Sequence, residues 1–210
     1  MIEYLDECAS TQTALIEALK SRVAVPDCAI IARRQSNGIG SRGNSWQSEE
    51  GNLYFSFCMA HSSLAMDIPS VSLSIYFAYV MKIYLETIGS KVWLKWPNDF
   101  YLNDRKIGGV ITNKIGEIYV CGMGINLEKA PEFGDILDVK ITPNELVNGF
   151  FNLLEQKISW KRIFSKYLIE FELSKKFNSH IDDKIISLKD AILCDDGSIK
   201  VGSERVYSLR

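Results

Sequence analysis

The sequence predicts an α+β fold, in which a mixed, mainly antiparallel sheet packs with helices and a very small β segment follows. Apolar, aromatic-rich runs of strand length recur along the chain, and two of them are joined tightly around Gly116. Longer stretches with apolar residues at helical spacing lie between and after these runs. The last thirty residues change to short β-like runs, so we divide the 210 residues into a main domain at 1–181 and a C-terminal segment at 182–210.

Helices are expected where capping residues precede apolar residues at helical spacing. Ser10 supplies a hydroxyl cap before the first such stretch. Thr142 and Glu145 form a capping box, with Pro143 at the first helical position. The expected helices cover residues 11–20, 69–88, 142–157 and 160–177.

Strands are expected where aromatic and β-branched residues form short apolar runs. Pro97 ends one of these runs because proline has no N–H for the ladder. Asp196 and Gly197 form a turn signal among the last β-like runs. The expected strands cover residues 29–33, 52–60, 92–96, 107–115, 117–127, 184–188, 199–201 and 205–209.

The composition excludes several classes of protein. Acidic and basic residues nearly cancel, 26 against 24, so the chain lacks the positive charge typical of nucleic-acid binding. No apolar stretch approaches the ~20 residues that cross a bilayer, and the opening residues do not resemble a signal peptide. The five cysteines are scattered and the chain has two histidines, so we expect no disulfide framework and no structural zinc site, but reduced thiols in a cytoplasmic protein.

A glycine-rich stretch at 35–46, QSNGIGSRGNSW, is the first candidate site. Its glycines let the backbone come close to a ligand, and Arg42 adds a fixed positive charge. The GxGxxG spacing is not followed by the apolar helix that a dinucleotide-binding fold needs, so we exclude that fold. Taken alone, the stretch also fits an ordinary surface loop.

The second candidate combines KWPND at 95–99 with DRKIGG at 104–109. Asn98 and Asp99 offer amide and carboxylate groups to a polar ligand or a metal. Two glycines after Lys106 leave room beside its ammonium group. Taken alone, this lysine and its glycines also fit a surface hairpin.

The third candidate is GMGIN at 122–126, at the end of an expected strand. Gly122 and Gly124 point to the same face and therefore leave a slot in the sheet surface. Taken alone, the pair also fits a β-bulge or close packing of a helix.

Together the stretches resemble the signature of biotin protein ligases, which reads S-T-N, Q-x-x-G-R-G-R-x-G-R-x-W, K-W-P-N-D with a downstream K-x-x-G, and G-x-G-x-N. The resemblance is strong over residues 8–127 and weak beyond, where the terminal YSLR resembles the closing strand of the family's small SH3-like domain. It implies a catalytic domain related to class II synthetases, followed by a shortened SH3-like β segment. It also implies the monofunctional class, because Ser10 lies nine residues after Met1 and leaves no room for a DNA-binding helix-turn-helix.

The resemblance also implies a role for each matching residue. Lys106 resembles the residue that bridges the biotin carboxylate and the α-phosphate. Arg42 stands at a position that the family leaves variable, and we expect it to share the catalytic role because it is the one basic residue in this loop. The biotin-binding residues that it implies are Ser10, Thr11, Gln12, Gln35, Gly38, Ile39, Gly40, Ser41, Lys106, Gly109, Gly122 and Gly124. The nucleotide-binding residues that it implies are Arg42, Trp46, Asn98, Lys106 and Asn126, with no metal ligand from the protein.

The chemistry that follows from the resemblance has two steps. The biotin carboxylate attacks the α-phosphorus of ATP and forms biotinyl-5′-AMP, with Mg²⁺ accompanying the nucleotide. A fixed cation lowers the repulsion between these two anions. A lysine of a biotin carboxyl carrier protein, a part of acetyl-CoA carboxylase, then attacks the acyl carbon.

The chain departs from the family pattern in its glycine-rich loop. Three expected arginines are replaced by Ile39, Ser41 and Asn44. Fewer bidentate donors predict weaker retention of the adenylate, with Arg42 and Lys106 carrying more of the load. The C-terminal segment is also short, which puts its contribution to ATP and carrier contacts in question.

Two rival functions remain open at this level. A lipoate or octanoate ligase of related fold needs an apolar tunnel, against which Ser10, Thr11 and Gln35 argue. A biotin-sensing or carrier-binding module without catalysis would not require Lys106 and Asn98. We expect no nucleic-acid or membrane partner, and a monomer or weak homodimer.

Overall fold

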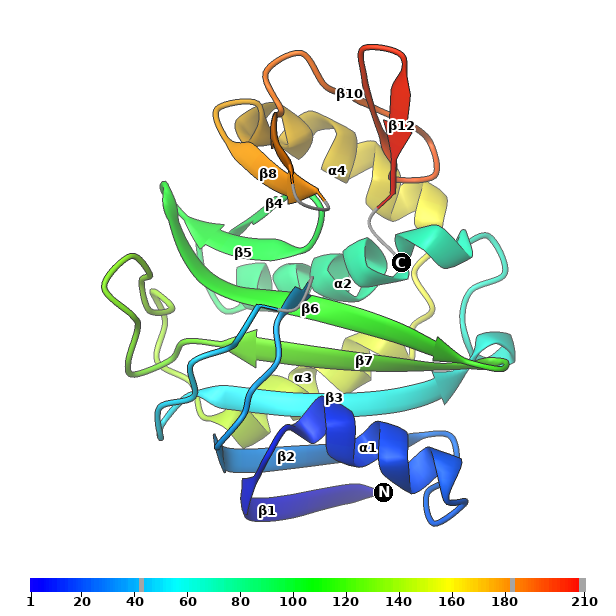
Figure 1. The fold of residues 1–210 in the computed structure, drawn as a ribbon, viewed down its shortest axis with the longest axis vertical. Coiled ribbons are helices and arrows are strands. Elements are labelled where there is room, and N and C mark those ends of the chain that lie inside the picture. The colour runs from blue at the N-terminus through cyan, green and yellow to red at the C-terminus, as the bar shows by residue number, and fades with distance from the viewer. Residues whose placement is uncertain (42–43, 182–183, 208–210) are drawn as a thin grey trace.

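The centre of the computed structural model is a seven-stranded sheet, and the residues described are 1–41, 44–181 and 184–207 (Figure 1). The strand order is β1-β2-β3-β7-β6-β5-β4. The first two strands run parallel and all other neighbours antiparallel, which confirms the predicted mixed, mainly antiparallel sheet. The strands are β1 (Ile2–Cys8), β2 (Cys28–Gln35), β3 (Leu53–Ala60), β4 (Trp93–Lys95), β5 (Asp99–Leu102), β6 (Arg105–Ile115) and β7 (Ile118–Ile125).

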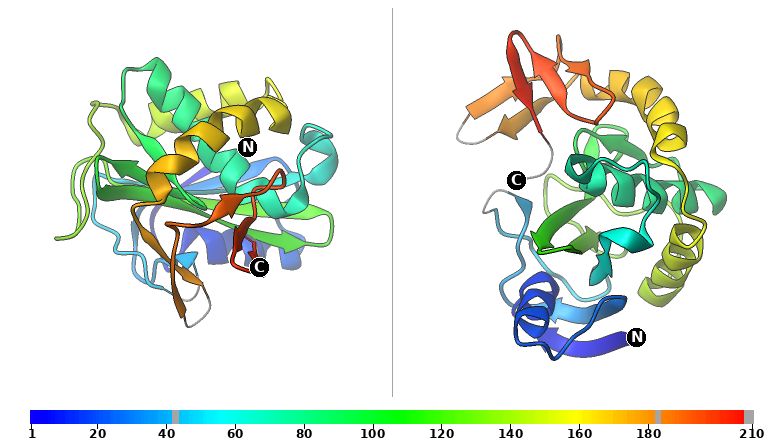
Figure 2. Two further views of the ribbon diagram at one scale, coloured as in Figure 1. Left: turned by 90° about the horizontal axis from the view of Figure 1, so that it is seen from above. Right: turned by 90° about the vertical axis from the view of Figure 1, so that its right-hand side faces the viewer.

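Four helices cover the two faces of this sheet. α1 (Thr11–Lys20) packs on β2, β3 and β7 from one face. On the opposite face lie α2 (Leu73–Thr87), α3 (Pro143–Leu154) and α4 (Trp160–Ser174), as the right-hand view of Figure 2 shows. No helix in the described part of the chain is long and apolar enough to cross a membrane.

The predicted caps set the starts of two helices. The Ser10 hydroxyl accepts a hydrogen bond from the Thr13 N–H and starts α1. Thr142 and Glu145 make the reciprocal capping box of α3, at 3.3 Å and 2.9 Å. α2 differs from the prediction, because residues 70–72 form a 3₁₀ turn and the α-helix begins only at Leu73.

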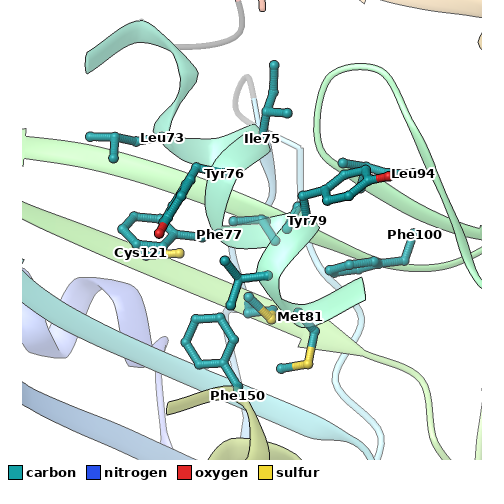
Figure 3. Close-up of a cluster of buried hydrophobic side chains, with 14 of the residues drawn as sticks. Leu73, Ile75, Tyr76, Phe77, Tyr79, Met81, Leu94, Phe100, Cys121 and Phe150 are labelled. Atoms are coloured by element: carbon teal, nitrogen blue, oxygen red, sulfur yellow. The ribbon is translucent and has the colours of Figure 1, made fainter. Parts of the chain in front are cut away.

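The main core lies between the sheet and α2 and α3 (Figure 3). Phe57 of β3 packs edge-on against Phe77 of α2, with ring centroids 5.0 Å apart. Phe150 of α3 lies 5.3 Å from the same ring. Because α2 is covered by the sheet, α3 and α4, eleven of its fifteen residues are buried, which explains its continuous apolar sequence.

Two small sheets lie beside α4, at the top of Figure 1, and all their strands except β8, which ends the predicted main domain, belong to the C-terminal segment. β8 (Asn178–Ile181) pairs with β9 (Lys184–Ser187), and β10 (Ile192–Leu193), β11 (Ile199–Val201) and β12 (Glu204–Val206) form a three-stranded sheet. The sequence predicted three of these five strands. Residues 208 and 209 of the last predicted run lie outside the described part of the chain.

Candidate active site

An open cavity lies on the face of the sheet that carries α1. The loop after β2 passes in front of β3 and β7 and forms one wall (Figure 1). The start of α1 forms a second wall, and β6 and β7 form the floor. The lining residues are Ser10, Thr11, Gln12, Gln35, Ile39, Gly40, Ser41, Trp46, Tyr54, Ser56, Asp99, Lys106, Gly109, Val110, Ile111, Gly122, Met123 and Gly124.

A hydrogen-bond network fixes the polar end of the cavity. The Thr11 backbone N–H donates to Gln35 Oε1 at 2.8 Å, and the Thr11 hydroxyl lies 2.9 Å from the Ser56 hydroxyl. Gln35 Nε2 donates to Ser48 Oγ at 3.0 Å. The start of α1, the end of β2 and the middle of β3 are therefore joined around one group of amides and hydroxyls.

Gln12 presents an unpartnered acceptor in this end of the cavity. Its side chain is 2% exposed, and its Nε2 donates to Asn113 Oδ1 and to the Val120 carbonyl, both at 3.0 Å. Its Oε1 is buried and has no hydrogen-bond partner. A Cβ at Gly122 would lie 2.6 Å from that oxygen. The glycine therefore keeps open the space in front of a buried acceptor.

Trp46 lies on the second glycine of the slot. A Cβ at Gly124 would be 2.8 Å from the indole ring, so only glycine allows this contact. The indole Nε1 is buried without a partner. A hydrogen bond from the Trp46 N–H to the Gly38 carbonyl, at 2.8 Å, fixes the chain on either side of the loop.

Lys106 and Asp99 form an ion pair at the edge of the cavity. Lys106 Nζ lies 2.6 Å from Asp99 Oδ1, and its ammonium group is 5.6 Å from the Trp46 ring. A Cβ at Gly109 would be 3.1 Å from the same carboxylate oxygen, so the glycine leaves room for the pair. A second ammonium, that of Lys95, lies 3.9 Å from Asp99 Oδ2. The Asp99 carboxylate on β5 therefore pairs with one ammonium group on each neighbouring strand, Lys95 on β4 and Lys106 on β6.

The structure brings most of the predicted site residues together. Every predicted biotin-binding residue lines the cavity except Gly38, whose position lets the Trp46 backbone pass close by. Asn98 and Asn126 do not line it, because their amide groups donate to the carbonyls of Val110 and Asp135. Arg42 lies outside the described residues.

Three polar lining residues are absent from the biotin- and nucleotide-binding residues that the resemblance implies. Ser56 and Tyr54 come from β3, and the signal for Ser56 is a polar residue inside an otherwise apolar strand. Asp99 was expected to offer a carboxylate to a polar ligand or a metal, and in the structure it lines the cavity and pairs with Lys106. Burial raises the pKa of the Tyr54 phenol, whose O–H donates to the Glu49 carbonyl, so this group remains neutral at physiological pH.

The fold and this cavity define a small-molecule-binding domain of the α+β class. Residues 4–129 match the biotin/lipoate A/B protein ligase family, and the chain belongs to that family. It is 41% identical over 107 residues to the bifunctional ligase/repressor BirA of Escherichia coli, covering 47% of this chain and 32% of that protein. It is 28% identical over 153 residues to a biotin–[acetyl-CoA-carboxylase] ligase of Paracoccus denitrificans, covering 67% and 61%.

The fold also matches a solved structure along nearly the whole chain. A biotin acetyl coenzyme A carboxylase synthetase from Helicobacter pylori, with bound biotinylated ATP, superposes with a TM-score of 0.94 at 38% identity, covering 98% of each chain. The small C-terminal strands are included in this match. The chain spans between about a third and three fifths of the length of the two curated relatives.

Proposed function

We propose that this chain is an ATP-dependent biotin protein ligase. It forms biotinyl-5′-AMP from biotin and ATP, and transfers biotin to a lysine of the biotin carboxyl carrier protein of acetyl-CoA carboxylase. The names of the relatives and of the Helicobacter pylori structure support this activity and this carrier.

The unpartnered Gln12 Oε1 is the observation that carries the proposal. A buried carbonyl without a partner costs about 1–3 kcal/mol, so its presence needs an explanation. The ureido group of biotin offers N–H donors, and the slot at Gly122 leads to this oxygen. An octanoyl or lipoyl chain offers no donor there and would leave the oxygen unpaired, which is a strong basis for rejection.

Lys106 supplies the electrostatic part of the reaction. Its ammonium lies at the cavity edge, where a carboxylate from inside the cavity meets a phosphate from outside. The cation lowers the repulsion between these two anions and stabilises the charge that develops as the carboxylate oxygen bonds to the α-phosphorus. Asp99 fixes the position of the ammonium before the substrates arrive.

The proposed nucleotide side of the active site is defined by Trp46, Arg42, Asn98 and Asn126. Trp46 offers an aromatic face beside Lys106. The two asparagines act by holding backbone next to the cavity, through their bonds to Val110 and Asp135.

The described residues contain no group of three or more acidic, histidine or cysteine side chains able to hold a metal. In this proposal Mg²⁺ is therefore held mainly by the triphosphate, where it neutralises the departing pyrophosphate.

The transfer step needs no nucleophile from the enzyme. The carrier lysine attacks the acyl carbon of the mixed anhydride, AMP leaves, and the loop at 36–41 shields the anhydride from water until then. We further propose that this protein acts without a nucleic-acid or membrane partner, as a monomer or weak homodimer. Residues 182–210 would form its SH3-like segment.

One incubation tests the proposal. The protein is mixed with Mg-ATP and either biotin or octanoate, and the acyl-adenylate is detected by mass spectrometry. The proposal expects biotinyl-AMP from biotin and no adduct from octanoate. An octanoyl-AMP signal would identify a lipoate-type ligase, and binding of biotin without any adenylate would identify a sensing module.

A further inference from the structure

Three consecutive carbonyls of the C-terminal segment accept hydrogen bonds from the main domain. The turn between β10 and β11 presents the carbonyls of Asp195, Asp196 and Gly197. Trp160 Nε1 donates to the first at 2.7 Å, the Ser72 hydroxyl donates to the second, and Trp96 Nε1 donates to the third at 2.9 Å. The donors come from α4, from the turn before α2, and from the connection between β4 and β5. We name residues 195–197 the docking turn.

The docking turn is itself rigid. Gly197 has φ +76°, a conformation that favours glycine, and its N–H donates to the Cys194 carbonyl at 2.8 Å. Asp196 accepts from the Ser198 N–H at 3.0 Å and pairs with Arg205 of β12 at 2.8 Å. The three-stranded sheet therefore presents its carbonyls in a fixed geometry.

Trp96 connects this turn to the candidate active site. Its side chain is fully buried, and its backbone N–H donates to Ser174 Oγ at the end of α4, at 3.0 Å. It directly follows Lys95, the residue that pairs with Asp99 across the β4–β5 hairpin. Asp99 in turn holds the Lys106 ammonium. A path of packed and hydrogen-bonded groups thus joins Gly197 to the proposed catalytic cation.

We infer that the docking turn positions the Lys95–Asp99 segment through the Trp96 indole, so that Trp96 is a positioning residue for adenylate formation. The inference rests on the proposed function and gives the short C-terminal segment a role inside the catalytic unit. Trp96 does not line the cavity, so it acts through Asp99 and not on the substrate.

The two tryptophans provide a matched pair of variants. Trp96→Phe and Trp160→Phe each remove one indole N–H from the same turn, but only Trp96 belongs to the segment that carries Asp99. Gly197→Ala perturbs the other end of the path, at the docking turn. Its Cβ would lie 2.8 Å from Ile75 Cδ1, and alanine would be strained at this positive φ. This third variant keeps Trp96 and tests the position of the carbonyl.

The experiment first measures the thermal unfolding of every variant. It then measures kcat and KM for biotinyl-AMP formation at a temperature below the onset of unfolding of all of them. Wild-type protein must form the adenylate, and its failure would refute the proposed function and not this inference. We expect Trp96→Phe and Gly197→Ala to lower kcat on the order of tenfold with the KM for biotin within twofold. Trp160→Phe should keep kcat within twofold while losing similar thermal stability.

Two results would overturn the inference. The first is an unchanged kcat in folded Trp96→Phe or Gly197→Ala protein. The second is an equal fall of kcat in Trp96→Phe and Trp160→Phe, which would show that general loosening of the fold, and not the position of Asp99, controls the rate.

Discussion

Adding one methyl group to the floor of the cavity should weaken biotin binding. In Gly122→Ala, the new Cβ would lie 2.6 Å from Gln12 Oε1 and 3.1 Å from Ile111 Cγ1. Gln12 cannot easily retreat, because its Nε2 is held by Asn113 and Val120. The oxygen is therefore covered or displaced, and the ligand loses its hydrogen bond.

The size of this effect follows from the value of one buried hydrogen bond. Leaving a buried group unpaired costs about 1–3 kcal/mol. At about 1.4 kcal/mol per factor of ten, the Kd for biotin should rise about 5- to 140-fold. Isothermal titration calorimetry without ATP measures this directly, because no chemistry follows binding.

Gly116→Ala is the matched control. Gly116 lies in the turn between β6 and β7, the two strands that form the floor, and its Cβ would meet nothing within 4 Å. Its φ of +57° costs alanine about 1 kcal/mol in folding, but the biotin site is untouched. Unchanged affinity in folded Gly122→Ala protein would show that biotin does not approach Gln12.

Three further predictions concern stability and the retention of the biotinyl-AMP intermediate. Thr142→Ala removes half of the capping box of α3 and should lower the free energy of unfolding by about 1 kcal/mol in urea titrations; no change would mean that the box is redundant. Burial acts to raise the pKa of Asp196, but hydrogen bonds from Ser198 and Arg205 outweigh it and hold the pKa below its usual 3.8. The stability that the ionised Asp196 contributes is present above pH 3.8 and is lost as the pH falls through the folded-state pKa. Asp196→Asn should therefore flatten the acid side of the plot of unfolding free energy against pH. Arg42→Ala should speed dissociation of biotinyl-AMP, and slow release in stopped-flow measurements would exclude Arg42 as an adenylate contact.

Much of the fold could be predicted because its elements carry local signals. The capping box at Thr142 indicates the start of a helix, and the apolar runs of β3, β6 and β7 each indicate a strand. β1 could not be predicted, because four of its seven residues are exposed at the sheet edge and its pattern is not apolar. β5 is only four residues long and follows a proline by two positions, so it left no pattern of its own.

The candidate site could be predicted in its outline and not in its internal bonding. The glycines and Lys106 indicated a cavity, and the structure brings them together. The sequence does not indicate which polar groups are used by the protein itself. Asn98 and Asn126 donate to backbone, whereas Gln12 leaves one oxygen free. This difference depends on contacts between strands that are far apart in the chain.

Exchange of labelled pyrophosphate into ATP in the presence of biotin tests the role of the Lys106 ammonium most directly. Lys106→Met keeps an unbranched side chain one atom shorter and removes the charge, and Lys114→Met does the same at an exposed ion pair on the same strand. We predict that Lys106→Met lowers the exchange rate about 10²- to 10³-fold, while Lys114→Met leaves it unchanged. Exchange at the wild-type rate in Lys106→Met would contradict the account.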